Sequence, residues 1–508
     1  MANFMERFME ASKAGYSAFI GAFNEEYVTS SLVNNDEFDE FDARRLRYAM
    51  YRASYENVSY RNIHTWAQGV RNRYGLGKYI ADVYNPTAQL VDFHVATIWR
   101  GNLVPLLKGG AIPLVVSSSN EDALRIAADN LLRMSNFEIG KDITVMYGCN
   151  LGDVGMKIID DATRGQVRIE PVDPSEIEYI LLENGIIKAY KQTRWANDTN
   201  DMLTKYSETC ERGDNDDVIF RTYINDRPAP LPGADLSEWV EPYGFIPFVT
   251  VQHRNVGRAW GWAEAHPIYP KIRVMDDQAT LLNDWIRRSV KSVGLISGIA
   301  APSSKKVTAT TSEATIDNPQ PGREESNYIF AGDGKAATYT PLIAPLDIAS
   351  TTANIQNIMA SIESDMPELR KSVWDISGDP SGVALATARE PVENKINKRR
   401  SAYDAGVVRA IQMGVAIGGY RDYAGFKGFD LTSYAKGQLD ISIAPRPVFA
   451  ESITEETAHK NSFWQTWASV ANSNVPFEVF AKDYGWTDDR IAEYQRQVQA
   501  GYIPATGL

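Results

Sequence analysis

The stretch Trp374-Asp-Ile-Ser-Gly-Asp-Pro-Ser-Gly382 lies between two segments with helical periodicity, and this arrangement decides how the chain folds around it. The preceding segment has apolar residues at helical spacing, at Ile355, Met359, Ile362, Met366 and Leu369. The following segment reads as a longer helix whose early turns carry Lys395, Lys398, Arg399 and Arg400. Glycine and proline disfavour a continuing helix, so we expect a loop held at both ends by helices. An ordinary helical hairpin in a large globular protein explains this stretch equally well, and the rest of the chain must decide.

The composition is that of a large globular protein. The chain has 508 residues, 44% of them hydrophobic and 11% aromatic, which suffices for roughly three or four core-sized units. Its formal net charge of −13 argues against a surface that grips nucleic acid by counterion release. An acidic protein can still contact DNA through local basic patches, or line a passage in which DNA slides without sticking.

Cysteine content and hydropathy indicate a protein of a reducing, cytoplasmic-type compartment. Cys149 and Cys210 are too few for a disulfide framework. Two free thiols are expected, and a single bridge between them is the alternative. The amino terminus does not read as a signal peptide, and no window approaches the ~20 apolar residues of a membrane helix.

The order of secondary structure predicts an α+β fold, with helices first and a β-rich region from about residue 141 to 265. Helices are expected over 41–58, from Asn85-Pro86 onward, and over 120–134 with Asn120 as the cap. Strands are expected over 154–159, 166–172, 178–182, 186–193, 218–223 and 245–251. Asn184-Gly185 joins two of them, and Asn-Gly favours a hairpin because both turn residues need positive φ.

Two helices flank a loop-rich insert in the next region. The first has a continuous apolar stripe at Met275, Ala279, Leu282, Ile286, Val290 and Val293, with Asp276 and other polar residues opposite. The second contains Ile358 and Ile362. The insert, 300–345, is rich in Ser, Thr, Pro and Gly, with strand-like pieces at 306–310 and 328–330. A flexible linker is the alternative reading, but two matched helices favour a protruding module. A strand begins at Asp440, and 451–500 is helical again.

The sequence lacks the motifs of an enzyme. Gly75-Leu-Gly-Lys78 and Gly332-Asp-Gly-Lys335 have the wrong spacing for a phosphate loop. Ser381 is not in a Gly-x-Ser-x-Gly elbow. The five histidines are scattered without zinc-ligand spacing. We therefore predict no catalytic, cofactor-binding or metal-binding residues.

Two positions have a functional and a structural interpretation. His94 lies beside an apolar helix face and is expected to be a packed core histidine instead of a base. Asp160-Asp161 could bind a metal, but adjacent acids in a predicted turn are expected to be solvated.

Short matching pieces, in order, make the chain resemble the portal (head-to-tail connector) proteins of tailed bacteriophages, in the large siphophage-type family. The pieces are Tyr84-Asn-Pro-Thr-Ala-Gln-Leu-Val-Asp-Phe93, Gly152-Asp-Val-Gly-Met-Lys-Ile-Ile-Asp160, Val167-Arg-Ile-Glu-Pro-Val-Asp-Pro174, Ile246-Pro-Phe-Val249 and Ser381-Gly-Val-Ala-Leu385. Each piece is short, and their order and spacing over most of the chain carry the resemblance. Pro391 departs from a straight helix and is expected to kink it near Glu390.

The resemblance implies a division of the chain. Residues 1–265 would be the wing, helical over 1–140 and β-rich over 141–265. The stem helices would be 266–294 and 346–372, with the clip, 295–345, between them. Residues 373–383 would be the tunnel loop, 384–450 the long wing helix and closing strand, and 451–508 the crown.

It also implies the residues that matter. The DNA channel would be lined by the tunnel loop, Trp374, Asp375, Ile376, Ser377, Gly378, Asp379, Pro380, Ser381 and Gly382. Lys395, Lys398, Arg399 and Arg400 are a candidate phosphate-facing basic band, with a solvated face or intersubunit salt bridges as the alternative. Leu282, Ile286, Val290, Ile358 and Ile362 would pack the stem.

The implied function is structural. A ring of about twelve subunits at a capsid vertex of the virion, assembled in the host cytoplasm, would let double-stranded DNA pass during packaging and ejection without reading its sequence. Implied partners are the terminase large subunit, the major capsid and scaffold proteins, and a head-completion or adaptor protein. Two alternatives remain: another head or adaptor protein without a DNA channel, and a nucleic-acid-processing enzyme.

Overall fold

The structure is a computed structural model, and it divides into two compact units, Met1–Arg446 and Pro447–Leu508. It describes residues 40–57, 84–99, 103–105, 112–116, 120–183, 185–197, 201–213, 215–290, 294–297, 328–331, 338–341, 348–370, 373, 382–444, 446–449, 453–470, 476–483, 486, 491–492 and 494–496.

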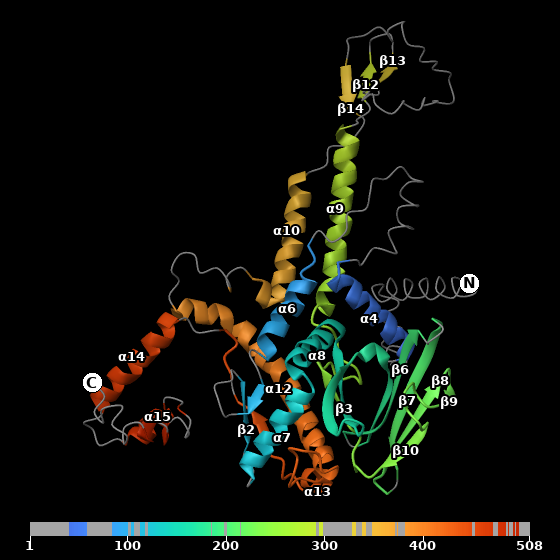
Figure 1. The fold of residues 1–508 in the computed structure, drawn as a ribbon. Helices are drawn as coiled ribbons and strands as arrows, with labels where there is room; N and C mark the ends of the chain where they lie inside the picture. The colour runs from blue at the N-terminus through green and yellow to red at the C-terminus, as the bar shows by residue number, and fades with distance from the viewer. Residues whose placement is uncertain are drawn as a thin grey trace. The chain divides into compact units, whose positions relative to one another are not determined.

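The first unit is built around one long helix, and a pair of helices extends away from the rest of it (Figure 1). Its helices are α4 (Phe41–Tyr55), α6 (Thr87–Ile98), α7 (Glu121–Met134), α8 (Phe137–Leu151), α9 (Tyr269–Val290), α10 (Ile348–Asp365), α12 (Gly382–Tyr420) and α13 (Leu431–Ala435). Three short 3₁₀ turns are η1 (Pro174–Glu176), η2 (His266–Ile268) and η3 (Pro367–Leu369). Helix α12 contacts α6, α7, α13 and the sheets, so it is the central packing element.

Small residues let α12 come close to its neighbours. A Cβ at Gly406 would lie 2.4 Å from Val251 Cγ2, and one at Gly414 would lie 2.6 Å from Leu131 Cδ2. Helical glycine costs about 1 kcal/mol relative to alanine, and close packing of large apolar side chains offsets that cost. The main core therefore forms where α12 meets α7, α8 and the strands behind them.

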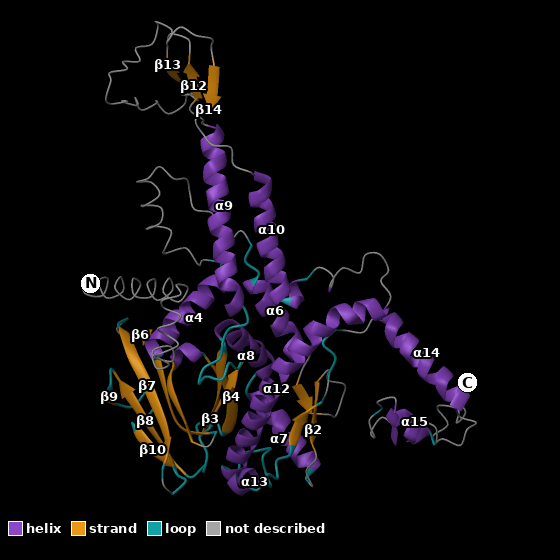
Figure 2. Ribbon diagram, turned by 180° about the vertical axis from the view of Figure 1, so that it is seen from behind, coloured by secondary structure: helices purple, strands orange, loops and turns teal. Residues whose placement is uncertain are grey.

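The strands of the described residues form four sheets, whose strands Figure 2 colours orange. The largest has the order β10-β8-β7-β6-β5, with β9 beside β8, and another has the order β11-β3-β4. These strands are β3 (Asp153–Asp161), β4 (Gln166–Val172), β5 (Ile177–Glu183), β6 (Ile186–Asn197), β7 (Leu203–Arg212), β8 (Val218–Ile224), β9 (Arg227–Pro228), β10 (Glu238–Glu241) and β11 (Phe248–Gln252). The two sheets pack together where Tyr190 stacks on Phe248 at 4.4 Å between ring centroids.

A third sheet joins distant parts of the chain. Strand β2 (Ile112–Val116) pairs in parallel with β1 (Leu103–Pro105) and antiparallel with β15 (Ile441–Ile443). The predicted strand after Asp440 is thereby confirmed.

Helices α9 and α10 lie side by side in both ribbon views. The strands of the fourth sheet lie between these two helices in the sequence. Lys271 Nζ on α9 lies 2.7 Å from Asp365 Oδ2 on α10. An apolar cluster that includes Ile272 and Ile362 joins them at their base. The fourth sheet consists of β12 (Gly294–Ser297), β13 (Tyr328–Ala331) and β14 (Thr338–Pro341), with the order β13-β12-β14.

The second unit contains α14 (Ile453–Val470) and α15 (Phe477–Asp483). Its core is aromatic: Phe463 stacks on Trp486 at 4.7 Å and lies 5.1 Å from Phe480, both between ring centroids. The expectation of helices after residue 451 is confirmed.

The predicted α+β class is confirmed, and most predicted elements are present. Strand β4 has the predicted bounds, and α7 starts after Asn120, although the Asn120 side chain makes no capping hydrogen bond. The predicted piece at 328–330 is strand β13, while 306–310 lies outside the described residues. Helix α12 continues through Pro391, and both ribbon views show its axis changing direction within its first half.

Two sequence predictions were wrong, and one strand was not predicted. Residues 141–151 belong to helix α8, so the β-rich region starts at Asp153. Strand β7 was not predicted, because its alternating polar residues resemble a loop. Asp276 does not face solvent with the other polar residues of α9 but is fully buried, as is Thr280, whose hydroxyl donates to Asp276 O at 2.7 Å.

Candidate functional site: a buried ionic cluster

Six ionisable side chains meet in the interior of the first unit, at the base of α10. They are His94, His253, Glu264, Glu368, Lys395 and Arg399, here called the junction cluster. Both carboxylates and both imidazoles are at most 2% exposed. Burial on this scale is costly for charged groups unless they are paired and hydrogen-bonded.

Distant parts of the sequence supply the cluster. His94 comes from α6, and Lys395 and Arg399 come from successive turns of one face of α12. Glu368 lies in η3, which follows α10 directly. His253 follows β11, and Glu264 is fixed by its backbone N–H, which donates to Cys149 O on α8 at 2.9 Å.

The ion pairs are short and shared. Lys395 Nζ lies 2.9 Å from Glu264 Oε1 and 2.7 Å from Glu368 Oε1. Arg399 Nε donates to Glu264 Oε2 at 2.9 Å. Two carboxylates are thus balanced by two cations, and the cluster is neutral when both histidines are neutral.

The protonation states follow from burial and from these partners. Burial lowers the pKa of His253 to about 4, although Glu264 opposes the shift. His253 is therefore neutral near pH 7, with Nε2 donating to Glu264 Oε2 and Nδ1 accepting from the Tyr403 hydroxyl, both at 2.9 Å. Burial alone would raise the pKa of Glu264, but the hydrogen bond from His253 and the charge of Lys395 hold it well below its usual value.

Glu368 behaves in the same way. Burial would raise its pKa, but the adjacent His94 ring and the Lys395 ammonium hold that pKa below its usual value. Glu368 Oε1 lies 3.5 Å from His94 Nε2. Both carboxylates of the cluster are therefore ionised at neutral pH.

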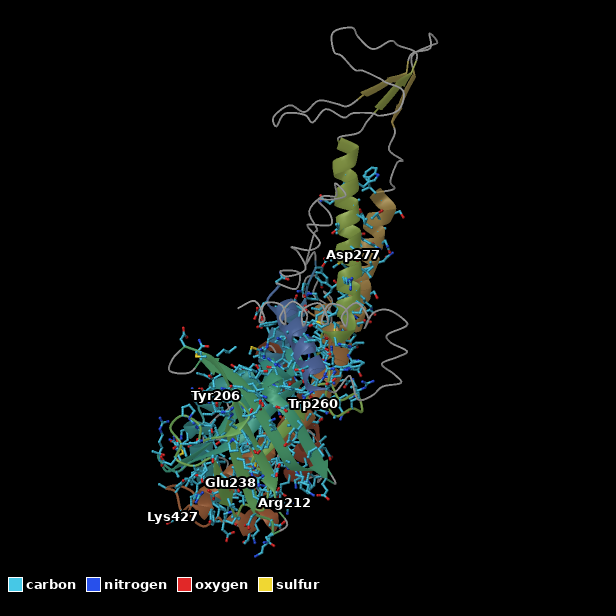
Figure 3. The ribbon with its side chains drawn as sticks, turned by 90° about the vertical axis from the view of Figure 1, so that its right-hand side faces the viewer. Tyr206, Arg212, Glu238, Trp260, Asp277 and Lys427 are labelled. Carbon is cyan, nitrogen blue, oxygen red and sulfur yellow. The ribbon has the colours of Figure 1, made fainter. Side chains whose placement is uncertain are left out.

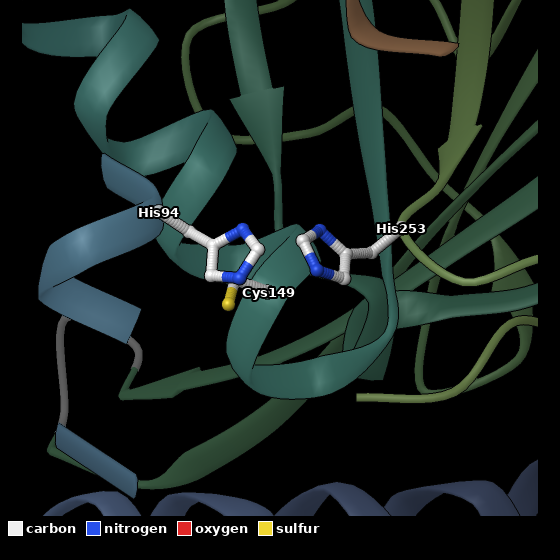
Figure 4. A group of neighbouring side chains, drawn as sticks. All are labelled: His94, Cys149 and His253. Carbon is white, nitrogen blue, oxygen red and sulfur yellow. The ribbon is translucent and has the colours of Figure 1, made fainter. Parts of the chain in front are cut away.

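A metal ion fits this cluster poorly. Two sets of three buried donors have ligand atoms within 4.8 Å of one another: His94, Cys149 and His253, shown in Figure 4, and His94, Glu264 and Glu368. Both nitrogens of His253 already have hydrogen-bond partners, and Lys395 and Arg399 neutralise the carboxylates. Burial and the charge of Glu264 raise the pKa of the Cys149 thiol well above its usual value, whereas metal binding needs a thiolate. The donor set favours a structural ionic network.

The junction cluster brackets the segment with which the sequence analysis began. Glu368 lies before residues 374–382 and Lys395 lies after them, and the two side chains are in contact. A second set of bonds fixes the same part of α12: Arg400 donates to Thr97 O and to Arg446 O, both at 2.6 Å. The cluster therefore ties both flanks of the segment to the core. It can hold a segment in place, and it offers no exposed nucleophile or base.

The tunnel-loop prediction lies almost entirely outside the described residues. Trp374 to Ser381 are not described, and Gly382 is described only as the first residue of α12. What the structure does describe is the frame on either side of that loop.

Three of the four residues predicted to form a phosphate-facing basic band have partners within the chain. Lys395 and Arg399 bind the buried carboxylates, and Arg400 is 4% exposed with its donors on backbone carbonyls. Only Lys398, of these four, is exposed. The other packed elements cover this face of α12, so its cations need acceptors inside the protomer.

The predicted stem residues differ in their surroundings. Ile362 is fully buried, Leu282 and Ile358 are half-buried, and Ile286 is 42% exposed. Val290 ends α9, and its side chain is not described.

Cys149 and Cys210 are both free and buried, which confirms the expected thiols. His94 is a buried histidine, as expected, but it belongs to an ionic cluster and not to a purely apolar core. Asp160 is not simply solvated: it accepts from Arg421 Nε at 2.7 Å and from the Tyr243 hydroxyl at 2.9 Å.

Among the described residues, no helix is long and apolar enough to cross a membrane.

Neither carboxylate of the cluster belongs to a recognisable sequence motif. Glu368 stands between Pro367 and Leu369 at the end of an apolar helix, and Glu264 stands between two alanines after Trp262. A lone acid in such apolar surroundings is a signal for a buried, paired carboxylate. Its partners could not be inferred, because Arg399 is 135 residues from Glu264.

Comparison with known proteins gives no family. No protein-family model matches the sequence, and no curated protein matches it. Among solved structures, a chain described as "Virion of native gene transfer agent (GTA) particle" is similar over 79% of this chain and 89% of that chain, with 10% sequence identity and a TM-score of 0.35. A likeness of this size establishes neither a common fold nor a common function.

Proposed function

We propose that this chain is a portal protein of a tailed-phage-type particle, whose copies form a ring through which double-stranded DNA is packaged and ejected. The proposal starts from the resemblance of the sequence pieces to that family. It is supported by the order of described elements: the helix α9, the small sheet β12–β14, the helix α10, and the long helix α12.

The observation that carries the proposal is the apolar surface of the paired helices. Val274, Leu281 and Ile286 on α9 are 48%, 66% and 42% exposed, and Ile348 on α10 is 46% exposed. Burying one such side chain stabilises by about 1.5–3 kcal/mol. Helices that leave several large apolar side chains in water are expected to pack against further copies of themselves, and a heterologous contact whose rotation closes around an axis forms a ring.

The proposed mechanism needs no bond chemistry in this chain. DNA carries one negative charge per ~1.7 Å of duplex axis, so a passage lined with fixed positive charge would retain it. A chain with net charge −13, whose cations on α12 are largely engaged inside the protomer, suits a wall along which DNA slides. The work would come from a separate terminase ATPase.

In this proposal residues 374–382 form the tunnel loop, and the junction cluster holds the two helices that present it. The small sheet β12–β14 belongs to the region that docks the terminase and later the head-completion or adaptor protein. The major capsid and scaffold proteins would surround the ring at the capsid vertex.

Imaging of the purified full-length chain tests the proposal. Negative-stain electron microscopy should show rings with a central hole, and light scattering should give a mass that is a multiple of the chain mass. A stable monomer at every concentration and salt level would contradict it. Closed particles without a hole would favour a head or adaptor protein, and ATP hydrolysis or DNA cleavage that a point variant of this chain abolishes would favour an enzyme.

A further inference from the structure

The carboxyl end of α6 is held by two arginines from distant parts of the chain. The last carbonyl groups of a helix have no partner within that helix. Arg400, on α12, donates from Nη2 to Thr97 O at 2.6 Å. Arg446 donates from Nη2 to Ile98 O at 2.7 Å. Both guanidinium groups also lie where the negative end of the helix dipole favours a cation, so the end of α6 is fixed by charge-assisted hydrogen bonds.

The same two arginines and Asp404 fix the backbone of Arg446. Arg446 binds Asp404 on α12 through two hydrogen bonds, from Nη1 to Oδ2 at 2.9 Å and from Nη2 to Oδ1 at 2.8 Å. Arg400, one turn earlier on α12, donates from Nη1 to Arg446 O at 2.6 Å. A two-bond pair between arginine and carboxylate fixes orientation as well as position, and the Arg446 side chain is only 5% exposed. Arg400, Asp404 and Arg446 are here called the α6 clamp.

The α6 clamp holds the residue at which the first unit ends. The first compact unit ends at Arg446, and the second begins at Pro447. The side chain of Arg446 and its carbonyl oxygen are both bonded to residues of α12. A force on the chain at Pro447 is therefore carried to α12 and to the end of α6 before it reaches any other helix of the first unit.

The α6 clamp lies within one helical turn of the junction cluster on both helices. On α6, Ile98 is four residues after His94, and on α12, Arg400 directly follows Arg399. Backbone hydrogen bonds join residues four apart in a helix, so neighbouring turns move together. His94 Nε2 in turn lies 3.5 Å from Glu368 Oε1. A displacement of the clamp therefore shifts two members of the junction cluster and alters the surroundings of its buried carboxylates.

We propose that the α6 clamp and the junction cluster are energetically coupled, so that the second unit acts on both flanks of segment 374–382 through Arg446. Coupling between sites is carried by continuous sets of packed groups and bonds, and one turn of α6 and one stretch of α12 supply two such routes. Both routes end at Glu368 in η3, which precedes the segment. The inference concerns a single chain and does not depend on ring formation.

Amide hydrogen exchange in η3 tests the coupling on the full-length chain. Among the described residues, Arg446 bonds to Ile98, Asp404 and Arg400 and makes no hydrogen bond to η3. Arg446→Met removes the clamp, and the amides of η3 should then exchange at least ~5-fold faster, the lower end of typical coupling between sites. Asp404→Asn breaks the two-bond pair with less loss of packing. It should act in the same direction, and it provides the test if Arg446→Met does not fold.

Arg421→Met is the matched control. Arg421 follows the other end of α12 and also forms two short ion pairs, with Asp160 at 2.7 Å and with Glu241 at 2.6 Å. Figure 3 shows Lys427, a few residues later, toward the opposite end of the first unit from Asp277 on α9. Arg421→Met should therefore leave exchange in η3 unchanged, even where it lowers the free energy of unfolding as much as Arg446→Met does.

A double variant gives an independent check. Lys395→Met already releases Glu368 from its cation, so adding Arg446→Met should raise exchange in η3 by a smaller factor than Arg446→Met does alone. Equal factors would show that the two clusters act separately and would overturn the inference. So would unchanged exchange in η3 in both clamp variants. Equal acceleration by Arg421→Met and Arg446→Met would overturn it as well, because η3 would then report only the global stability.

Discussion

Lys395 Nζ lies 2.7 Å from Glu368 Oε1, and these two residues stand on opposite sides of the segment 374–382. Glu368 is 2% exposed, and Lys395 also contacts Glu264. The contact closes the chain on itself at the base of α10, so the ends of the segment are held by one neutral ionic cluster. The energetics of that contact are measurable.

We first predict that Lys395→Met destabilises the protein by about 3–5 kcal/mol, because removing one partner leaves buried carboxylates uncompensated. The double variant Lys395→Met with Glu368→Gln should recover part of the loss, since Glu264 and Arg399 then balance each other. Urea unfolding of both single variants and the double variant gives the coupling between the two residues.

An exposed pair of the same length is the matched control. Lys271 Nζ and Asp365 Oδ2 are also 2.7 Å apart, but their side chains are 31% and 39% exposed. Lys271→Met should cost only about 0–1 kcal/mol. Similar small losses for Lys271→Met and Lys395→Met would show that the junction cluster contributes little to stability.

A second prediction concerns pH and Asp153. Burial raises the pKa of Asp153 from 3.8 to about 6, although Gly261 N–H, Arg47 and Tyr48 oppose the shift. The folded state therefore holds more protons than the unfolded state between about pH 4 and pH 6, and stability falls as pH rises through that window. At pH 7 the ionised group costs up to about 3 kcal/mol.

Asp153→Asn should remove that cost. Its stability relative to the unmodified chain should increase from pH 4 to pH 6 and stay constant above, as measured by urea unfolding at several pH values. Groups common to both proteins, such as the buried histidines, cancel in this difference. A difference that does not change with pH would mean that Asp153 keeps its ordinary pKa.

Elements whose structure is decided by local patterns could be predicted from the sequence. Strand β4 and the helices at α4, α6 and α7 follow from periodicity and turn residues. Residues 141–151 were expected to belong to the β-rich region, but they are part of helix α8. There Gly148 leaves room for the Tyr403 hydroxyl, which would lie 1.9 Å from a Cβ at that position. Tertiary packing decides that element, and local propensity does not.

The candidate site was less predictable than the fold. Helical periodicity places Lys395 and Arg399 on the same side of α12, but it does not say whether that side faces solvent. Only the fold brings Glu264 and Glu368 to them, across separations that leave no local signal. The sequence therefore suggested a phosphate-facing band, and only the structure shows that Lys395, Arg399 and Arg400 have acceptors within the chain.

A third prediction concerns ring assembly. Leu281 on α9 is 66% exposed, and Leu281→Asp should prevent assembly, because a charge would have to be buried between subunits. The matched control is Leu236→Asp, since Leu236 is 62% exposed but lies outside the paired helices. Light scattering should give monomers for the first variant and rings for the second. Equal assembly of both variants would place the subunit contact elsewhere.

The last prediction concerns the segment 374–382 itself. If the junction cluster holds its ends, deleting Ser377–Ser381 should leave ring assembly and the melting temperature unchanged, because no contact of the cluster is removed. Packaging or retention of DNA should be impaired, because in the proposed function this segment lies in the channel. The informative experiment runs a packaging assay beside thermal melting of the isolated ring. Charge reversal at Lys398, the exposed member of the predicted band, belongs in the same assay, and it should change packaging without changing the melting temperature. Unchanged packaging by the shortened protein would remove the loop from the mechanism, and loss of the ring would show that the segment is structural.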